Sequence, residues 1–163
     1  MEEFYEQYNG KDYGNFQNIM NSIEYASLIL VAVYILGFRT LLIGSFVFLI
    51  YVGIVYFNRK KFVAYEYELT LDSFVVSKVM TEKRRKKLLE FNLSDVECVS
   101  KTQRNEKKCE MIKAYINDKE SNNQYIYVKT ASGLKCLVLN MDEKLISMCY
   151  KIKPSIFKDL ICK

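Results

Sequence analysis

The sequence of 163 residues has no histidine, no tryptophan, one proline and six glycines. Without histidine, the chain can form no Ser-His or Cys-His catalytic couple, no histidine-ligated zinc site and no imidazole pH switch. No glycine lies in a G-x-G-x-x-G or G-x-x-x-x-G-K-[ST] pattern, so phosphate-binding loops of these kinds are excluded as well. The composition therefore names no specific chemistry and predicts no cofactor and no metal.

The five cysteines form no C-x-x-C pair, which excludes a zinc ribbon or a thioredoxin-like site. Their number is odd, and the pattern indicates reduced thiols in a reducing compartment, used mainly as small apolar side chains. A redox role for one of them is the alternative. They are Cys98, Cys109, Cys136, Cys149 and Cys162.

Charge is almost absent from one block of the chain, residues 25–57, in which Arg39 is the only charged residue. Residues 1–57 carry 2 basic and 5 acidic residues (2 − 5 = −3), and residues 58–163 carry 22 and 14 (22 − 14 = +8), which together give the net charge of +5. A bilayer core needs roughly 20 apolar residues in a helix, and this block is too long for one span. It shows no polar face, unlike a helix of a soluble core.

The break at Gly37-Phe38-Arg39-Thr40 predicts two helices, about residues 19–37 and 40–57, joined by a short turn. The basic triplet Arg59, Lys60 and Lys61 flanks the second helix. The positive-inside rule therefore predicts an integral membrane protein of the cell membrane with both termini in the cytoplasm. The acidic N-terminus does not fit a cleaved signal peptide.

Glu24 is the one carboxylate inside the predicted spans. A turn centred near Phe38 would place it level with about Val52, within hydrogen-bonding reach of Tyr51 or Tyr56. Two interpretations stay open: an intramembrane proton or ion site, or a hydrated carboxylate near the interface.

After residue 61 the apolar pattern changes to a period of two, which predicts strands. Asn140 is a candidate helix cap, with Glu143 completing a capping box, and an apolar stripe follows at helical spacing. Pro154 interrupts this helix, and a second short helix can follow it. Residues 1–18 have no clear period and are expected to be loose or a short surface helix. The predicted strands cover about residues 65–71, 74–80, 86–92, 96–101, 110–117, 124–130 and 134–140.

Seven antiparallel strands followed by a helix are typical of a small barrel of two nearly orthogonal sheets with one end plugged. With segments such as Tyr65-Glu66-Tyr67-Glu68-Leu69-Thr70 and Phe91-Asn92-Leu93-Ser94-Asp95-Val96, the sequence resembles bacterial pleckstrin-homology-like (PH-like) domains that follow a two-helix membrane anchor. The resemblance implies an α+β membrane protein. Its predicted parts are a cytoplasmic segment (1–18), a transmembrane hairpin (19–57) and a PH-like cytoplasmic domain (62–163).

Two groups of cations fall on predicted loops of this domain, the first a run of five at a hairpin tip. Cations near an anionic leaflet favour its headgroups, so one hypothesis is an anionic-lipid or phosphate-binding surface. The alternative is a solvated tip that blocks association of sheet edges. Nucleic acid is disfavoured, because the groups contain neither exposed aromatic residues nor a recognition helix. The residues are Lys83, Arg84, Arg85, Lys86, Lys87, Arg104, Lys107 and Lys108.

The resemblance implies a binding or scaffolding module and supplies no catalytic residues. Asp95 and Glu97, two apart on a predicted strand, would support acid–base chemistry only if buried in different environments. We therefore expect a membrane-anchored, non-catalytic protein whose partners are the bilayer, anionic lipid headgroups or another membrane protein. The alternatives are an accessory subunit of a larger membrane complex and a small ion- or proton-handling protein that uses Glu24.

Overall fold

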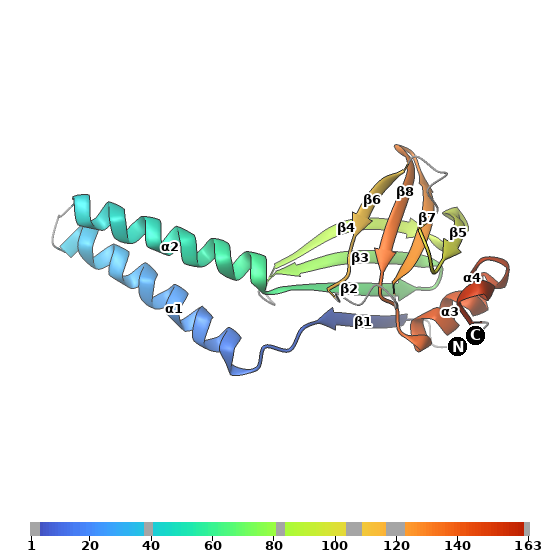
Figure 1. The fold of residues 1–163 in the computed structure, drawn as a ribbon, viewed down its shortest axis with the longest axis horizontal. Coiled ribbons are helices and arrows are strands. Elements are labelled where there is room, and N and C mark those ends of the chain that lie inside the picture. The colour runs from blue at the N-terminus through green and yellow to red at the C-terminus, as the bar shows by residue number, and fades with distance from the viewer. Residues whose placement is uncertain (1–3, 38–40, 81–83, 104–108, 117–122, 162–163) are drawn as a thin grey trace. The chain divides into compact units, whose positions relative to one another are not determined.

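The structure is a computed structural model that describes residues 4–37, 41–80, 84–103, 109–116 and 123–161. The chain divides into two compact units: Lys11–Val63 is mainly helical, and Met1–Gly10 together with Ala64–Lys163 forms a β unit (Figure 1). The β unit is thus discontinuous in sequence, because the helical unit is inserted between its first and second strands.

The helical unit is an antiparallel pair, as the sequence predicts. It contains α1 (Asn15–Ala32), which continues as the π-helix η1 (Val33–Gly37), and α2 (Leu41–Lys61). Both helices are long and apolar enough to cross a membrane. Helix α2 runs four residues past its predicted end, so the basic triplet forms its last turn. Cations there complement the partial negative charge of a helix C-terminus. The predicted turn residues 38–40 lie outside the described residues.

The first sheet has the order β1-β2-β3-β4 and contains the strand that the sequence analysis missed. The expectation of a loose segment or a short helix for residues 1–18 is wrong, because residues 4–10 form β1 and pair antiparallel with β2 from Phe4↔Thr70 to Gly10↔Ala64. Exposed and half-buried residues do alternate in β1, but the half-buried ones are Tyr, Gln and Asn, so no apolar pattern of period two appears in the sequence. The strands are β1 (Phe4–Gly10), β2 (Val63–Thr70), β3 (Ser73–Met80) and β4 (Arg84–Asn92).

The second sheet has the order β5-β7-β8-β6, and its strands run crosswise to those of the first sheet (Figure 1). The expectation of only antiparallel strands is wrong for β6, which pairs parallel with β8. Strand β8 lies between β6 and β7, and it is parallel to β6 but antiparallel to β7. The described residues thus contain eight strands instead of the predicted seven. Those of this sheet are β5 (Val96–Ser100), β6 (Glu110–Lys113), β7 (Gln124–Thr130) and β8 (Gly133–Leu139).

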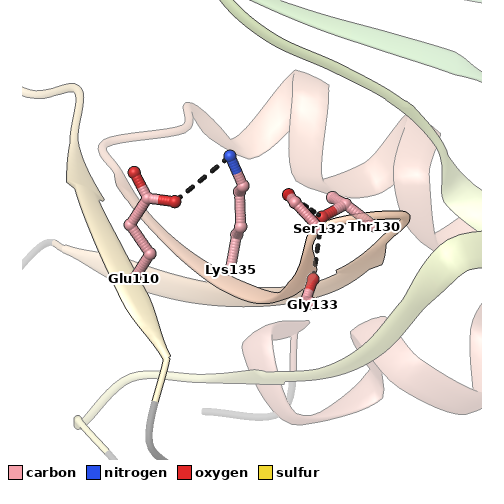
Figure 2. A network of polar contacts seen from close by, with 5 residues as sticks. All are labelled: Glu110, Thr130, Ser132, Gly133 and Lys135. Atoms are coloured by element: carbon pink, nitrogen blue, oxygen red, sulfur yellow. Dashed lines mark hydrogen bonds and ion pairs between the residues drawn. The ribbon is translucent and has the colours of Figure 1, made fainter.

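Local polar contacts support the parallel pair and the β7–β8 turn (Figure 2). Glu110 and Lys135 are register partners, and their side chains form an ion pair of 3.2 Å. At the turn, the hydroxyl of Thr130 donates to the carbonyl oxygen of Gly133 at 2.7 Å. Gly133 itself has φ +114°, a conformation that side chains rarely adopt.

The core lies between the two sheets and is closed by α3 (Glu143–Ile152) and α4 (Pro154–Ile161), the second helix that Pro154 begins. The predicted cap is wrong by two residues: Asp142, and not Asn140, caps α3, and its side chain accepts from the Leu145 amide at 2.7 Å. Leu145, Cys149 and Phe157 are fully buried against the sheets. The sequence signal was ambiguous because Asn140 and Asp142 are both good capping residues.

Candidate functional site

One end of the first sheet is the end at which the chain enters and leaves the helical unit. Strand β1 ends there at Gly10, opposite Ala64 near the start of β2. Strand β3 ends and β4 begins at the same end, where Met80 is paired with Arg84. We call this the anchored end of the sheet, and it is formed by residues 8–10, 63–66, 78–80 and 84–87.

The basic run lies at the anchored end, with Lys86 and Lys87 on a strand as predicted, whereas Arg84 and Arg85 belong to this strand and not to the predicted hairpin tip. Residues 84–87 are the first four residues of β4, and all four are exposed. Strand pleating therefore sends their side chains to alternate faces of the sheet. Four further predicted site residues, Lys83, Arg104, Lys107 and Lys108, lie outside the described residues.

The first group of cations is Lys78, Arg84 and Lys86. Their side chains are on the face of the sheet that packs on the core, but closer to the anchored end than the last core residue of β3. Lys78 follows the core residue Val76 by two positions in β3, and it is directly opposite Lys86 of β4. Arg84 is on the same face as Lys86. Like charges directly opposite each other destabilise a strand pair. Among the described residues, none of these three cations has a carboxylate partner within ion-pair distance. Sequence reasoning missed Lys78, because only strand register brings it to the basic run.

The second group lies on the opposite face and is already neutralised. Arg85 forms an ion pair of 2.9 Å with Glu66 of β2, and Lys87 forms one of 2.6 Å with Glu90. Glu66 is only 6% exposed, whereas Lys87 and Glu90 are both open to solvent. The cations on one face of β4, Arg85 and Lys87, are thus paired with carboxylates, whereas Arg84 and Lys86 on the other face form no ion pair among the described residues.

Among the described residues of the β unit, Glu66 is the carboxyl whose pKa departs most from its ordinary value. Burial, followed by a hydrogen bond with the Glu6 side chain, raises the pKa of Glu66 to about 7, although the nearby Arg85 lowers it in part. Glu6 and Glu68 are register partners on β1 and β2, so Glu68 adds a further negative charge beside the pair. Two adjacent carboxyls retain a proton because both cannot easily be ionised together.

Polar side chains on the inner face of β1 attach it to the rest of the β unit. Gln7 donates to the Asn140 carbonyl and accepts from the Asp142 amide, both at 2.9 Å. The Tyr5 hydroxyl donates to the Asp142 carboxylate at 2.6 Å. These contacts hold the strand that leads into α1 against the segment that leads into α3.

The hydroxyl of Tyr67 joins four segments at one buried point. It donates to the carbonyl oxygen of Ala114, and it accepts from the Asn9 side-chain amide at 3.3 Å and from the Asn140 backbone amide at 3.2 Å. Tyr67 is completely buried, and burial raises the pKa of its hydroxyl. The hydroxyl is therefore neutral and acts as a structural link at physiological pH.

The basic triplet at the end of α2 is tied into the helical unit. The Lys61 ammonium lies 4.8 Å from the centre of the Phe16 ring and 5.1 Å from that of Phe57. Tyr13 donates its hydroxyl to the Lys61 carbonyl at 3.1 Å. Such amphipathic contacts between Lys and aromatic rings are common at membrane interfaces. Arg59 and Lys60 are exposed.

Glu24 has a different partner from the predicted tyrosines. The side-chain amide of Asn58, which is fully buried, donates to the Glu24 carboxylate at 2.7 Å and to the Met20 carbonyl at 3.4 Å. The prediction of Tyr51 or Tyr56 is wrong, because Glu24 is level with Asn58, six residues beyond the predicted Val52 along α2 (58 − 52 = 6). The contact identifies Glu24 as one side of a link between α1 and α2. Its role in ion handling stays a prediction.

The remaining candidates show no catalytic arrangement. Asp95 and Glu97 are both exposed, and Asp95 lies in the 3-10 turn η2 (Leu93–Asp95) instead of on a strand. Burial raises the pKa of Cys136 to about 11 and that of Cys149 to about 12, so both are unreactive thiols. Among the described residues, no group of three or more acidic or cysteine side chains is arranged to hold a metal ion.

Two crossed four-stranded sheets closed by C-terminal helices define an α+β protein of the PH-like class. A family model described as a bacterial PH-like domain (DUF6106) matches residues 1–159, and the chain belongs to this family. The resemblance seen in the sequence is thereby confirmed. The match includes β1 and both long helices, so the discontinuous β unit is part of the family pattern. Neither a curated protein nor a solved structure was found to match the chain.

Proposed function

We propose that this protein is a membrane-anchored, non-catalytic binding module whose basic sheet end contacts anionic headgroups of the inner leaflet. Helices α1 and α2 form the transmembrane hairpin in this proposal, with both termini in the cytoplasm. PH-like domains are generally binding modules, and the two acidic candidates Asp95 and Glu97 are both exposed.

The observation that carries the proposal is the like-charged group Lys78, Lys86 and Arg84 at the anchored end. An anion placed among these side chains relieves their mutual repulsion, which gives the surface a preference for phosphate-containing headgroups. Each cation near an anionic leaflet contributes about 1 kcal/mol.

Chain connectivity supports the same proposal. Residues 11–14 join β1 to α1, and Phe62 alone joins α2 to β2. Four residues span about 14 Å at full extension, so both connections limit the separation between the anchored end and the helix ends. The basic triplet Arg59, Lys60 and Lys61 lies at the second connection and adds to the positive charge near the leaflet.

Lysine acetylation in nanodiscs tests the contact. We expect Lys78 and Lys86 of the full chain to react more slowly in nanodiscs that contain phosphatidylglycerol than in nanodiscs of phosphatidylcholine alone. Lys151 and Lys158, which are exposed on α3 and α4, serve as internal controls and should react equally in both. Equal rates for Lys78 and Lys86 in the two lipids would contradict the contact.

Charge reversal provides the matched variants. The pair Arg84→Glu and Lys86→Glu should abolish the protection of Lys78 by anionic lipid, whereas Lys151→Glu with Lys158→Glu should leave it intact. Retained protection of Lys78 in the first variant would contradict a binding surface formed jointly by Lys78, Arg84 and Lys86.

A further inference from the structure

Glu6, Glu66 and Arg85 form a small polar group on the outer face of the first sheet, away from Lys78 and Lys86. Glu66 is almost fully buried, and it contacts a carboxyl of β1 and a guanidinium of β4 at the same time. Arg85 itself is 68% exposed and belongs to the basic run at the anchored end. The group therefore connects a titratable side chain with a cation that is available to solvent.

The charges around Glu66 come from three strands. Strand β1 contributes Glu6, with Tyr8 as the register partner of Glu66, and β2 contributes Glu68. Strand β4 contributes Arg85 and Lys87, and Lys87 is already paired with Glu90. The β3 residues next to this part of β4 on the outer face are the uncharged Ser77 and Val79. Arg85 is thus the cation that balances the charge of Glu66.

We propose that the Glu6–Glu66 carboxyl pair is a proton-controlled latch on Arg85, which holds the guanidinium when Glu66 is ionised and frees it for anionic headgroups when Glu66 is protonated. The inference rests on the proposed leaflet contact and adds its regulation by pH. A protonated Glu66 keeps its proton and donates a hydrogen bond to the carboxylate of Glu6, so Arg85 loses the negative charge of its ion-pair partner. Headgroup contact therefore strengthens as the pH falls from 8.5 to 6.

The test is the lysine acetylation ratio, defined as the rate for Lys86 in phosphatidylcholine nanodiscs divided by its rate in phosphatidylglycerol-containing nanodiscs at the same pH. Taking both rates at one pH removes the intrinsic pH dependence of lysine reactivity. For the full wild-type chain we expect this ratio to be up to about fivefold higher at pH 6 than at pH 8.5, the effect of one added cation near an anionic leaflet.

Three variants separate the latch from a general effect of pH. Glu66→Gln imitates the protonated carboxyl and should give the high ratio at both pH values. Arg85→Gln should give the low ratio at both. Glu90→Gln removes a carboxylate that is paired with a cation of the same strand but is exposed, and it should keep the wild-type pH dependence.

The possible failures are distinguishable. A ratio above one that is the same at both pH values in the wild type, or a pH dependence that persists in Glu66→Gln, overturns the latch and leaves the leaflet contact standing. A ratio of one at both pH values overturns the leaflet contact and the latch together.

Discussion

At the scale of single residues, the polar side chains that face inward decide how the β unit is closed. Tyr67, Gln7 and Asp142 are each satisfied by partners from distant parts of the chain. A buried donor or acceptor that loses its partner costs about 1–3 kcal/mol, more than an average hydrogen bond contributes. These residues therefore determine which segments stay together.

Tyr67→Phe tests this role. The variant keeps the ring but leaves the Ala114 carbonyl and the Asn9 and Asn140 amides without their common partner. We expect a loss of about 1–3 kcal/mol in the free energy of unfolding, measured by chemical denaturation of the full chain in detergent. Tyr65→Phe on the same strand is the matched control, because no hydrogen bond of its hydroxyl is found among the described residues. A loss as large in the control would refute the assignment.

Glu66 predicts a pH dependence of stability. The carboxyl titrates near 4.5 in an unfolded chain and at about 7 in the folded protein. Its contribution to stability is therefore fully present below about pH 4.5 and is lost as the pH rises to about 7. Thermal unfolding between pH 5 and pH 8 should show a smaller decrease in Tm for Glu66→Gln than for the wild type, while Glu90→Gln should follow the wild type. Parallel curves for all three proteins would be evidence against the raised pKa.

At the scale of elements, the start of α3 shows how one cap is chosen among two candidates. Asp142 accepts from the Leu145 amide through one oxygen and from the Tyr5 hydroxyl through the other. Asn140 instead uses its backbone groups, which bind Tyr67 and Gln7. The cap position is thus selected together with the docking of β1.

The cap predicts different effects of two alanine substitutions. Asp142→Ala should destabilise the protein by about 1–2 kcal/mol, because α3 loses its cap and Tyr5 loses its acceptor. Asn140→Ala should cost less, because no hydrogen bond of its side chain is found among the described residues. Urea unfolding followed by circular dichroism measures both, and the reverse order of effects would favour the capping box predicted from sequence.

At the scale of the whole molecule, the helical unit is an insertion between two paired strands. Gly10 and Ala64 are register partners although 54 positions separate them (64 − 10 = 54). A β unit that begins after the helices therefore lacks β1, exposes the edge of β2 and leaves the polar partners of Gln7 and Asn9 unsatisfied. The β unit cannot be taken as residues 62–163 alone.

Two truncated chains test this organisation. We expect residues 62–163 alone to aggregate or unfold. A chain in which residues 11–62 are replaced by a short Asn-Gly hairpin turn should be a soluble, folded monomer, because such turns suit directly paired antiparallel strands. Size-exclusion chromatography and amide NMR spectra distinguish the two outcomes. Equal stability of both chains would mean that β1 is dispensable.

The proposed topology places the half-exposed thiols Cys98 and Cys109 in the cytoplasm. A membrane-impermeant maleimide should label them in inside-out vesicles and leave them unlabelled in right-side-out vesicles, with mass spectrometry to locate the modified sites. Cys136 and Cys149 should react slowly in both, because burial raises the pKa of each thiol. Labelling of Cys98 and Cys109 in right-side-out vesicles would show the opposite topology, with the β unit outside the cell.

Sequence alone determined the parts of this protein whose signal is local and apolar. The two long helices, seven of the strands and the interruption at Pro154 follow from hydrophobic periodicity, which depends on neighbours within one element. The basic run at residues 84–87 could also be read from the sequence, because it consists of consecutive residues. The PH-like resemblance followed from the order of the predicted elements.

Only the tertiary structure decided which of these parts meet. Strand β1 escaped detection because its inward side chains are polar and gain their partners from residues more than 50 positions away. The pairing of Lys78 with Lys86, the burial of Glu66 beside Glu6 and the contact of Glu24 with Asn58 all depend on strand or helix register. Register depends on turn geometry and on packing between distant segments. The local sequence patterns of this chain do not determine either one.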